Sequence, residues 1–251
     1  MNAMWSAAKL KVSHRLAMHL RVSEGFRMRN DHPMVSFTFD DVPKSGVTTG
    51  AAMLEEHGAR GTFYVSGGLT GIDTDAWEAC TAEDIIGLHR RGHEIGCHTF
   101  SHARVPDLDD AALADEIGCN RRYFHALDPS IKAETFAYPY GYASFARKRL
   151  LAQEFQSCRG ILPGVNSGVV DLQFLRSTPL IDGEIDQGGI DRAFDEAQST
   201  NGWLIFFGHD VTERPSSYGC TPSLLKHALE VASTKKIEVL TMAEALRCAR
   251  A

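Results

Sequence analysis

The segment Val35-Ser-Phe-Thr-Phe-Asp-Asp41 organises the rest of the chain. Apolar residues stand at every second position, which predicts a β-strand, and the strand ends in two adjacent carboxylates. In α/β proteins the chemistry gathers where parallel strands end, because the loops that follow them meet on one face. The segment therefore predicts an α/β fold with Asp40 and Asp41 at its functional face.

A second segment, His98-Thr-Phe-Ser-His102, follows the strand-like run from Gly92 to Cys97. Histidines four residues apart would lie on one face of a helix and could close on a single metal ion. This spacing alone arises easily by chance. The metal-site interpretation depends on the carboxylates of Asp40 and Asp41, which follow another expected strand. Two imidazoles and one carboxylate leave coordination positions open for water and substrate, which is typical of a catalytic metal site.

The 251 residues fit one large α/β domain better than two. A net charge of −6 argues against a nucleic-acid partner, and no apolar run is long enough to span a bilayer. The six cysteines are scattered without a Cys-x2-Cys pair, which fits reduced thiols in a cytoplasmic protein better than a disulfide framework. No secretory signal pattern is found, so the expected localisation is cytoplasmic.

Residues 1–33 form a basic N-terminal extension, distinct from the domain expected over residues 34–251. In its first thirty residues, six lysines and arginines face a single acid, Glu24. Leu10, Leu16, Ala17 and Leu20 have near-helical spacing, so a basic amphipathic helix at a membrane surface is one interpretation. A surface helix packed on the domain, or a partly disordered extension, is the better one.

Strand-like and helix-like segments alternate from residue 34 to the C-terminus. The strands are expected at 34–39, 61–66, 92–97, 135–138, 157–162, 174–181, 203–207 and 237–241. The helices are expected at 46–57, 81–92, 109–127, 144–155, 190–199, 221–233 and 242–248. Seven or eight β-then-α units without a linker predict a single, irregular or incomplete (β/α) barrel. Asp40 and Asp41, His98 and His102, the turn 139–141, and His209 each follow an expected strand, so all should meet at one rim.

These elements, in this order, resemble the polysaccharide deacetylase family, also called the NodB-homology domain or carbohydrate esterase family 4. The resemblance covers about residues 34 to 245. It rests on Thr38-Phe-Asp-Asp41, His98-Thr-Phe-Ser-His102, Phe136-Ala-Tyr-Pro-Tyr-Gly141 and Ile205-Phe-Phe-Gly-His-Asp210. The resemblance implies Asp40 as general base and Asp41, His98 and His102 as metal ligands. It further implies His209 as general acid and the backbone N–H of Tyr140 as an oxyanion donor.

One motif departs from the family pattern. The family carries an arginine two residues before the proline of the third motif, paired with the catalytic aspartate, and this chain has Ala137 there. Arg159, on the next expected strand, is the first candidate to supply the missing guanidinium, and Arg176 is the second. Asp182, at the end of the expected strand 174–181, is the candidate to hold His209 in its working tautomer.

The resemblance implies a metal-dependent hydrolase that removes N-acetyl groups from an amino sugar in an oligo- or polysaccharide. One divalent ion is expected, zinc first, although histidine and carboxylate ligands also accept cobalt, nickel, manganese or iron. Two alternatives remain open. One is a deformylase or other amide hydrolase acting on a lipid-linked sugar, and the other is a carbohydrate-binding protein without turnover. A non-haem iron oxygenase is disfavoured because its usual His-x-Asp spacing is absent.

Overall fold

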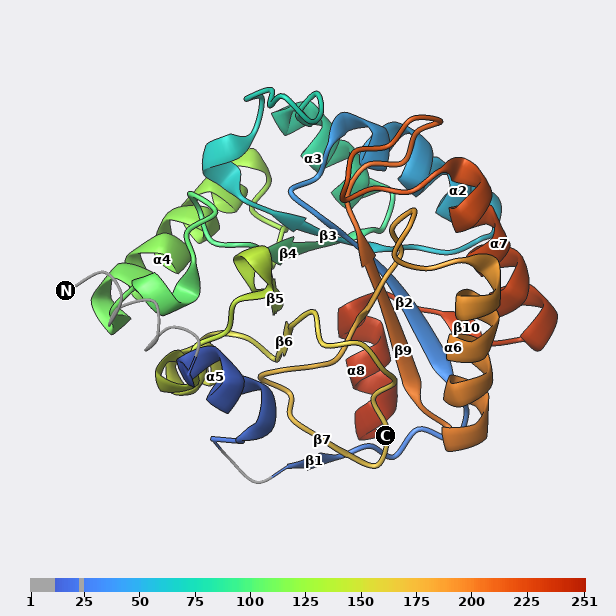
Figure 1. The fold of residues 1–251 in the computed structure, drawn as a ribbon. Coiled ribbons are helices and arrows are strands. Elements are labelled where there is room, and N and C mark those ends of the chain that lie inside the picture. Colours follow the sequence, from blue (N-terminus) through green and yellow to red (C-terminus); the bar gives the residue numbers. More distant parts are fainter. Residues whose placement is uncertain (1–11, 23–24) are drawn as a thin grey trace.

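The computed structural model describes residues 12–22 and 25–251. Its centre is a parallel sheet that curls into the expected (β/α) barrel, with strand order β6-β5-β4-β3-β2-β9-β8 and β10 paired to the start of β2 (Figure 1). The strands are β2 Met34–Asp40, β3 Thr62–Val65, β4 Glu94–Cys97, β5 Thr135–Ala137, β6 Ser157–Arg159, β8 Thr178–Pro179, β9 Trp203–Gly208 and β10 Glu238–Val239. A small antiparallel pair joins β1 Phe26–Arg27 to β7 Val169–Val170.

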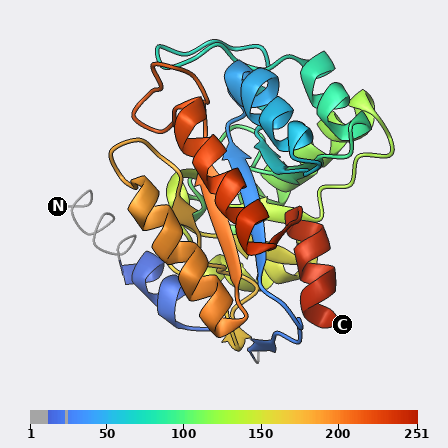
Figure 2. The ribbon, with the colours of Figure 1, turned by 90° about the vertical axis from the view of Figure 1, so that its right-hand side faces the viewer.

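Helices cover the outer face of the sheet, with α6 and α7 lying over β2 and β9 in the side view (Figure 2). They are α2 Ala51–Glu56, α3 Ala82–Arg90, α4 Asp110–Leu127, α5 Lys148–Glu154, α6 Gln187–Thr200, α7 Pro222–Lys235 and α8 Met242–Arg250. A π-helical turn, Gly46–Gly50, precedes α2. Most begin at a side-chain cap that satisfies free backbone N–H groups, as Thr81 does for α3. None of the described helices is long and apolar enough to cross a bilayer.

Strand alternation decides which side chains enter the barrel. In β2, Val35, Phe37 and Phe39 point outward and join the apolar core beneath the helices, whereas Ser36, Thr38 and Asp40 point inward. Ser36 accepts a hydrogen bond from Trp203 Nε1 at 2.9 Å, so the inward hydroxyl is satisfied. Because Asp40 is the last residue of the strand, its carboxylate stands inside the barrel at the carboxyl end.

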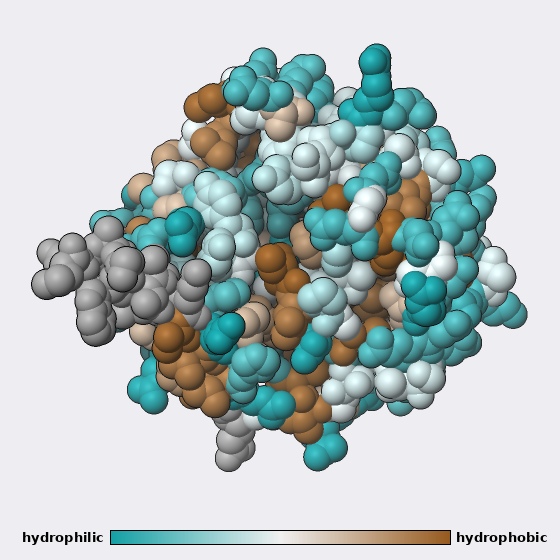
Figure 3. Space-filling view, in the orientation of Figure 1, coloured by the Kyte–Doolittle hydropathy of each residue, from teal (hydrophilic) through white to brown (hydrophobic). Residues whose placement is uncertain are grey.

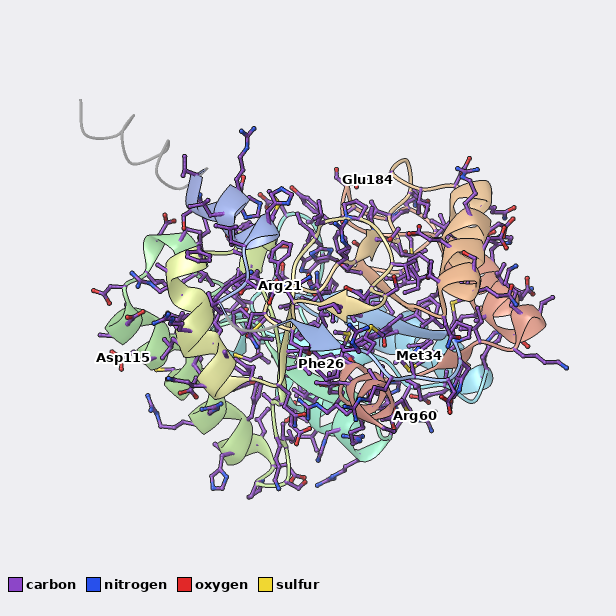
Figure 4. The ribbon with its side chains drawn as sticks, turned by 90° about the horizontal axis from the view of Figure 1, so that it is seen from below. Arg21, Phe26, Met34, Arg60, Asp115 and Glu184 are labelled. Carbon is purple, nitrogen blue, oxygen red and sulfur yellow. The ribbon has the colours of Figure 1, made fainter. Side chains whose placement is uncertain are left out.

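The opposite end of the barrel is closed by α8. Met242, Leu246 and Ala249 are fully buried and pack with Met34 and Trp203 from the starts of β2 and β9. Figure 4, which shows the molecule from below, places Met34 at this end. In the described part of the chain, the barrel is therefore closed at this end and opens at the carboxyl ends of its strands.

A tightly filled interior explains Gly96 on β4. A Cβ at this position would stand 2.4 Å from the Tyr64 ring, which occupies the barrel opposite. The ring is fully buried, so it has no room to move aside. Only glycine fits beside it.

The expected strand over 174–181 is largely wrong, because only Thr178–Pro179 pairs as β8. The chain before β8 forms a single bridge, Leu175 with Arg159 of β6, and β8 itself pairs with β9. This segment thus crosses from one edge of the sheet to the other and links them. Its pairing is too sparse for one long strand, with a single bridge to β6 and two paired residues to β9.

The N-terminal extension packs on the domain in its described part. Residues 12–19 form a helix whose Ala17 is fully buried. His14 Nδ1 accepts the N–H of Ala143 at 3.1 Å, and Lys148 Nζ donates to the Leu20 carbonyl at 2.9 Å. This agrees with a surface helix packed on the domain; Lys9 and Leu10 lie outside the described residues.

Glu94, at the start of β4, ties four elements together, which leads to a stability prediction. Its carboxylate accepts hydrogen bonds from Thr62, Thr135 and the backbone N–H of Ala243. Glu94→Ala would leave these enclosed donors unpaired and is expected to lower the free energy of unfolding by about 2–4 kcal/mol. Urea unfolding followed by circular dichroism measures the change. Glu213→Ala, at an exposed loop position, is the control, and an equal, small effect of both substitutions would contradict the assignment.

Candidate active site

The two carboxylates that end β2 separate because the backbone turns sharply after Asp40. Asp41 and Val42 both have positive φ, 56° and 47°. Such values are strained for a β-branched residue and are often kept at functional sites. The turn directs Asp40 down into the barrel and leaves Asp41 at its mouth.

His98 and His102 approach each other through a loop, so the helical face predicted for them is wrong. Thr99 and His102 have positive φ, 58° each, which breaks any helix. The Glu116 side chain of α4 holds the loop by accepting the backbone N–H groups of Phe100 and Ser101, each at 2.8 Å. The two imidazole rings lie 4.9 Å apart between centroids. They are brought together by the loop that Glu116 holds, and not by the periodicity of a helix.

Asp41, His98 and His102 form a three-ligand cluster of the kind the sequence predicts. One donor atom from each lies within 4.8 Å of the others. Asp41 Oδ1 is 3.3 Å from His102 Nε2 and 3.7 Å from His98 Nε2. This oxygen is buried and has no hydrogen-bond partner, so it faces the imidazoles with unsatisfied acceptor capacity. An orphaned carboxylate oxygen beside two imidazole nitrogens fits a divalent cation such as zinc.

The imidazole of His98 is oriented for metal binding. Its Nδ1 lies 2.8 Å from the backbone carbonyl of Ala137, which fixes the proton on Nδ1 and leaves the Nε2 lone pair toward Asp41. Burial lowers the pKa of His98 to about 3 and also lowers the pKa of His102. Burial raises the pKa of Asp41 to about 6. Both rings are therefore neutral ligands, and Asp41 is a carboxylate whose charge lacks a close cation.

Arg159 reaches Asp40 from β6, in the place expected for it. Its guanidinium is fully buried, and Nη2 donates to both carboxylate oxygens of Asp40. Burial raises the pKa of Asp40, but the Arg159 charge and its neighbours outweigh burial and hold the pKa below its usual value. The second candidate, Arg176, is exposed and donates to the Pro163 carbonyl. The pair is therefore not the usual bidentate arrangement, in which two guanidinium nitrogens each donate to one carboxylate oxygen. Here the single nitrogen Nη2 of Arg159 donates to both oxygens of Asp40.

His209 stands on the other side of Asp41, with Nε2 3.9 Å from Asp41 Oδ2. Its Nδ1 lies 3.1 Å from the backbone carbonyl of Tyr218. The expectation that Asp182 would orient this ring is wrong, since Asp182 is exposed and accepts from the backbone and hydroxyl of Thr221. A backbone carbonyl has taken the role because the loop after β9 folds back over the ring.

That loop is shaped by Asp210, the neighbour of His209. Its carboxylate accepts the backbone N–H and the hydroxyl of Ser216, at 2.8 and 2.6 Å. These bonds hold residues 212–220 in a turn that delivers the Tyr218 carbonyl to His209. Asp210 therefore positions the histidine indirectly, through the backbone.

Tyr140 lies at the mouth of the barrel in a strained turn. Its φ of 57° is left-handed, and the bond from the Gly141 N–H to the Tyr138 carbonyl, 2.8 Å, closes the turn. The Tyr140 ring is 4.3 Å from the His102 ring and more than half exposed. The turn brings the Tyr140 backbone beside the ligand cluster; its role as an oxyanion donor stays a prediction.

The residues expected at one rim line or border a single pocket of about 420 Å³. Asp40, Asp41, His98, His102 and His209 form its polar floor. Its walls are aromatic and apolar, and are made by Trp77, Tyr140, Ile161, Pro163, Pro179, Ile181, Phe207 and Tyr218. Glu184 adds one carboxylate at the edge. A polar floor under apolar walls fits a ligand whose reacting group is polar and whose body is flat.

Trp77 is a wall residue that the sequence analysis missed. Its indole stacks on the His209 ring with centroids 5.7 Å apart and an interplanar angle of 29°. It belongs to the long loop after β3, between Gly67 and Ala79. Every loop that follows a strand of the barrel lies at the same rim. A single tryptophan in a loop otherwise made mostly of small and acidic residues could therefore have been predicted to line the site.

Comparison with known proteins finds a family model and curated relatives that match this chain. Residues 27–155, just over half of the chain, match the family model described as polysaccharide deacetylase. A chitin deacetylase of Pestalotiopsis sp is 32% identical over 82 residues, which are 33% of this chain and 26% of that protein. A gellan lyase of Bacillus sp is 28% identical over 126 residues, 50% of this chain and 5% of that protein. The chain thus spans about a quarter or less of these relatives.

Solved structures share the fold over most of the chain. The chitin deacetylase from Colletotrichum lindemuthianum superposes with a TM-score of 0.62 at 17% identity, covering 86% of this chain and 89% of that one. A family 4 acetyl xylan esterase from Clostridium thermocellum in complex with a cobalt ion gives 0.59 at 19% identity, covering 85% and 90%. At such identities the likeness concerns the fold.

Proposed function

This chain belongs to the polysaccharide deacetylase family, and from that premise we propose that it is a metal-dependent hydrolase of N-acetyl groups on an amino sugar of the N-acetylglucosamine type. The observation that carries the proposal is the arrangement around Asp41. An unsatisfied carboxylate oxygen and two neutral imidazoles face the pocket, with a paired carboxylate and a third histidine beside them. A structural metal site would be closed by a fourth protein ligand, whereas this one opens to the pocket.

Asp41, His98 and His102 would hold the cation. When bound there, a divalent ion would lower the pKa of a water molecule and polarise the acetyl carbonyl. Zinc suits three nitrogen and oxygen ligands with an open position, and the same donors accept cobalt, nickel, manganese and iron.

Asp40 and His209 divide the proton transfers. Asp40 is kept ionised by Arg159, so it can accept a proton from the attacking water. His209 donates its Nδ1 proton to the Tyr218 carbonyl, so Nε2 is the nitrogen left for proton transfer. Once Nε2 has taken up a second proton from solvent, the imidazolium would give that proton to the departing amine. The N–H of Tyr140 would donate to the oxyanion.

The walls of the pocket suit a sugar ring. Trp77, Tyr140 and Tyr218 present aromatic faces around the polar floor, and flat apolar faces pack well against the C–H groups of a pyranose. The acetamido group would then point down to the cation site. This placement supports an N-acetylated oligosaccharide as substrate.

Acetate release tests the proposal. The protein reconstituted with zinc should release acetate from N-acetylated chitooligosaccharides and lose this activity after chelation. Measuring formate release from an N-formylated sugar in parallel separates the deformylase alternative. Sugar binding without release of either acid would instead support the non-catalytic alternative.

Arg159 provides a further prediction, because it pairs with Asp40 without facing the substrate. Arg159→Met removes the charge that counters burial, so the pKa of Asp40 should rise. A base with a higher pKa becomes protonated earlier on acidification, so the acidic limb of the pH-rate profile should move to higher pH. The value of kcat should fall about tenfold to a hundredfold with little change in KM.

Arg159→Lys is the matched control, since it restores a positive charge to the same strand position. It should recover part of the rate and move the acidic limb back. If Met and Lys variants have the same pH profile as the unaltered protein, Arg159 serves packing alone.

A further inference from the structure

Several exposed apolar side chains lie at the pocket and on the N-terminal segment. In the described part of the chain, nine large apolar side chains are more than a third exposed. Three of them, Tyr140, Ile161 and Tyr218, line the pocket. Three more, Val12, Leu16 and Leu20, belong to the N-terminal segment. Such exposed residues are ordinary when scattered singly, but a concentration on one face marks an interaction surface.

Direct contacts connect the N-terminal helix to the pocket. His14 lies 5.3 Å from the Tyr142 ring, which is itself 40% exposed. Tyr142 follows Gly141, where a Cβ would meet the Ile161 side chain at 2.3 Å. Ile161 and Gly141 both line the pocket. The packed side of the helix therefore adjoins the segment that borders the pocket mouth.

The helix, with the Leu20 that follows it, presents apolar residues outward, away from its packed side. Val12, Leu16 and Leu20 recur every four residues and are 56%, 40% and 47% exposed, whereas Ala17 is fully buried. Arg15, His19 and Arg21 are also exposed along this segment. Apolar side chains flanked by cations are typical of a helix that lies in the surface of a bilayer.

Helix and pocket share one side of the molecule. Figure 4 shows Glu184, at the pocket edge, and the N-terminal helix along the same upper edge. Figure 3 shows apolar surface both near the middle of the face and at its lower left, where Figure 1 places the N-terminal helix. A flat partner could touch both at once.

Charge separates the same segment from the rest of the chain. The first 30 residues carry a net charge of +5, while the remaining 221 carry −11. A second copy of this chain would bring two basic segments together, which is repulsive for a symmetric contact. An anionic lipid surface instead attracts the basic segment and accepts the exposed leucines.

We propose that the surface formed by Val12, Leu16 and Leu20 together with the exposed side chains of Tyr142 and Ile161 docks on an anionic lipid bilayer, and that the pocket takes an acetamido sugar carried on a lipid. The second half rests on the proposed function. Docking with the pocket facing the bilayer presents Ile161 of the pocket wall, and Tyr142 next to the wall residue Gly141, to the lipid end of such a substrate. The sugar then reaches the polar floor.

Vesicle sedimentation of the full chain tests the docking. Binding to phosphatidylcholine vesicles that contain phosphatidylglycerol is expected to exceed binding to pure phosphatidylcholine and to weaken with salt. Leu16→Glu with Leu20→Glu should reduce binding at least about tenfold, because it removes two exposed apolar side chains that would enter the bilayer and adds repulsion. Gln198→Glu with Ser199→Glu adds the same charge on exposed positions of α6 and should leave binding unchanged.

Several outcomes would overturn the docking surface. These are no vesicle binding by the unaltered protein, equal binding by the two double variants, and a dimer in light scattering that the leucine variant dissolves. The last would assign the face to a second copy.

A substrate arm separates this inference from the proposed function. The leucine variant should hydrolyse a soluble N-acetylated chitooligosaccharide normally and lose about tenfold in rate on a long-chain alkyl glycoside of N-acetylglucosamine embedded in anionic vesicles. Equal loss on both substrates would overturn the lipid-linked substrate. Vesicle binding without hydrolysis of either substrate would leave the docking intact and reject the proposed deacetylase.

Discussion

Replacing His98 by Ala is expected to abolish zinc retention and to reduce acetate release at least about a thousandfold. The effect is large because a bound cation supplies several kcal/mol of charge stabilisation to the reaction, and about 4 kcal/mol corresponds to a thousandfold. His98 contributes the most buried ligand nitrogen and is fixed by the Ala137 carbonyl. Metal content after gel filtration, measured by atomic emission, and turnover with added zinc measure the two losses.

A second variant, His102→Ala, tests the same metal site with less risk that the substitution itself disrupts folding. Its side chain lies nearer the surface, so its removal disturbs the core less, yet it should also lose the metal. His125→Ala, an exposed histidine on α4, is the control and should keep both metal and activity. Full activity of a metal-free His98→Ala protein, with its circular dichroism unchanged, would reject the three-residue cation site.

The sequence alone predicts which strand residues face the barrel interior, because side chains alternate between the two faces of a strand. Alternation in Val35–Asp41 places Asp40 inside the barrel, and the same alternation directs Arg159 of β6 to the interior. Because neighbouring parallel strands are in register, Ala137 on β5 lies beside Arg159 on β6. A guanidinium lost from one strand can therefore be replaced from the next without changing the barrel.

Loops explain where the sequence is insufficient. The His98–His102 spacing fits a helix, but the loop depends on Glu116 fourteen residues beyond His102, and no local pattern reveals that pairing. Asp182 lies beyond the end of β8, which stops at Pro179, and the loop after β9 supplies a backbone carbonyl to His209 in its place. Backbone groups carry no sequence signature. Roles filled by them are visible only in three dimensions.

The domain boundary at residue 33 shows the same limitation. Composition separates the basic extension from the rest of the chain, but β1 pairs with β7 and Arg29 donates its backbone N–H to the Ala249 carbonyl at 2.9 Å. The charge of a segment can indicate what the segment binds, whereas its packing shows which folding unit it belongs to. The two need not end at the same residue.

Asp40→Asn is expected to keep the metal and reduce kcat about a hundredfold or more, because the amide cannot accept the proton of the attacking water. Asn has nearly the same shape as Asp and leaves the Asp41, His98 and His102 cluster intact. Metal analysis and steady-state acetate release measure the two quantities. Loss of the metal would mean that Asp40, and not Asp41, is the ligand.

Asp40→Asn should also lower the stability of the protein, and this effect must be distinguished from the loss of catalysis. It leaves the buried Arg159 guanidinium without its counter-charge, which costs about 3–5 kcal/mol when a buried pair is broken. The double variant Asp40→Asn with Arg159→Met removes both charges, so it should regain much of the stability lost in the single variant. If Asp40 is the general base, the double variant stays inactive although it is folded and holds metal. Recovery of turnover together with stability would show that the aspartate acts only by neutralising the arginine.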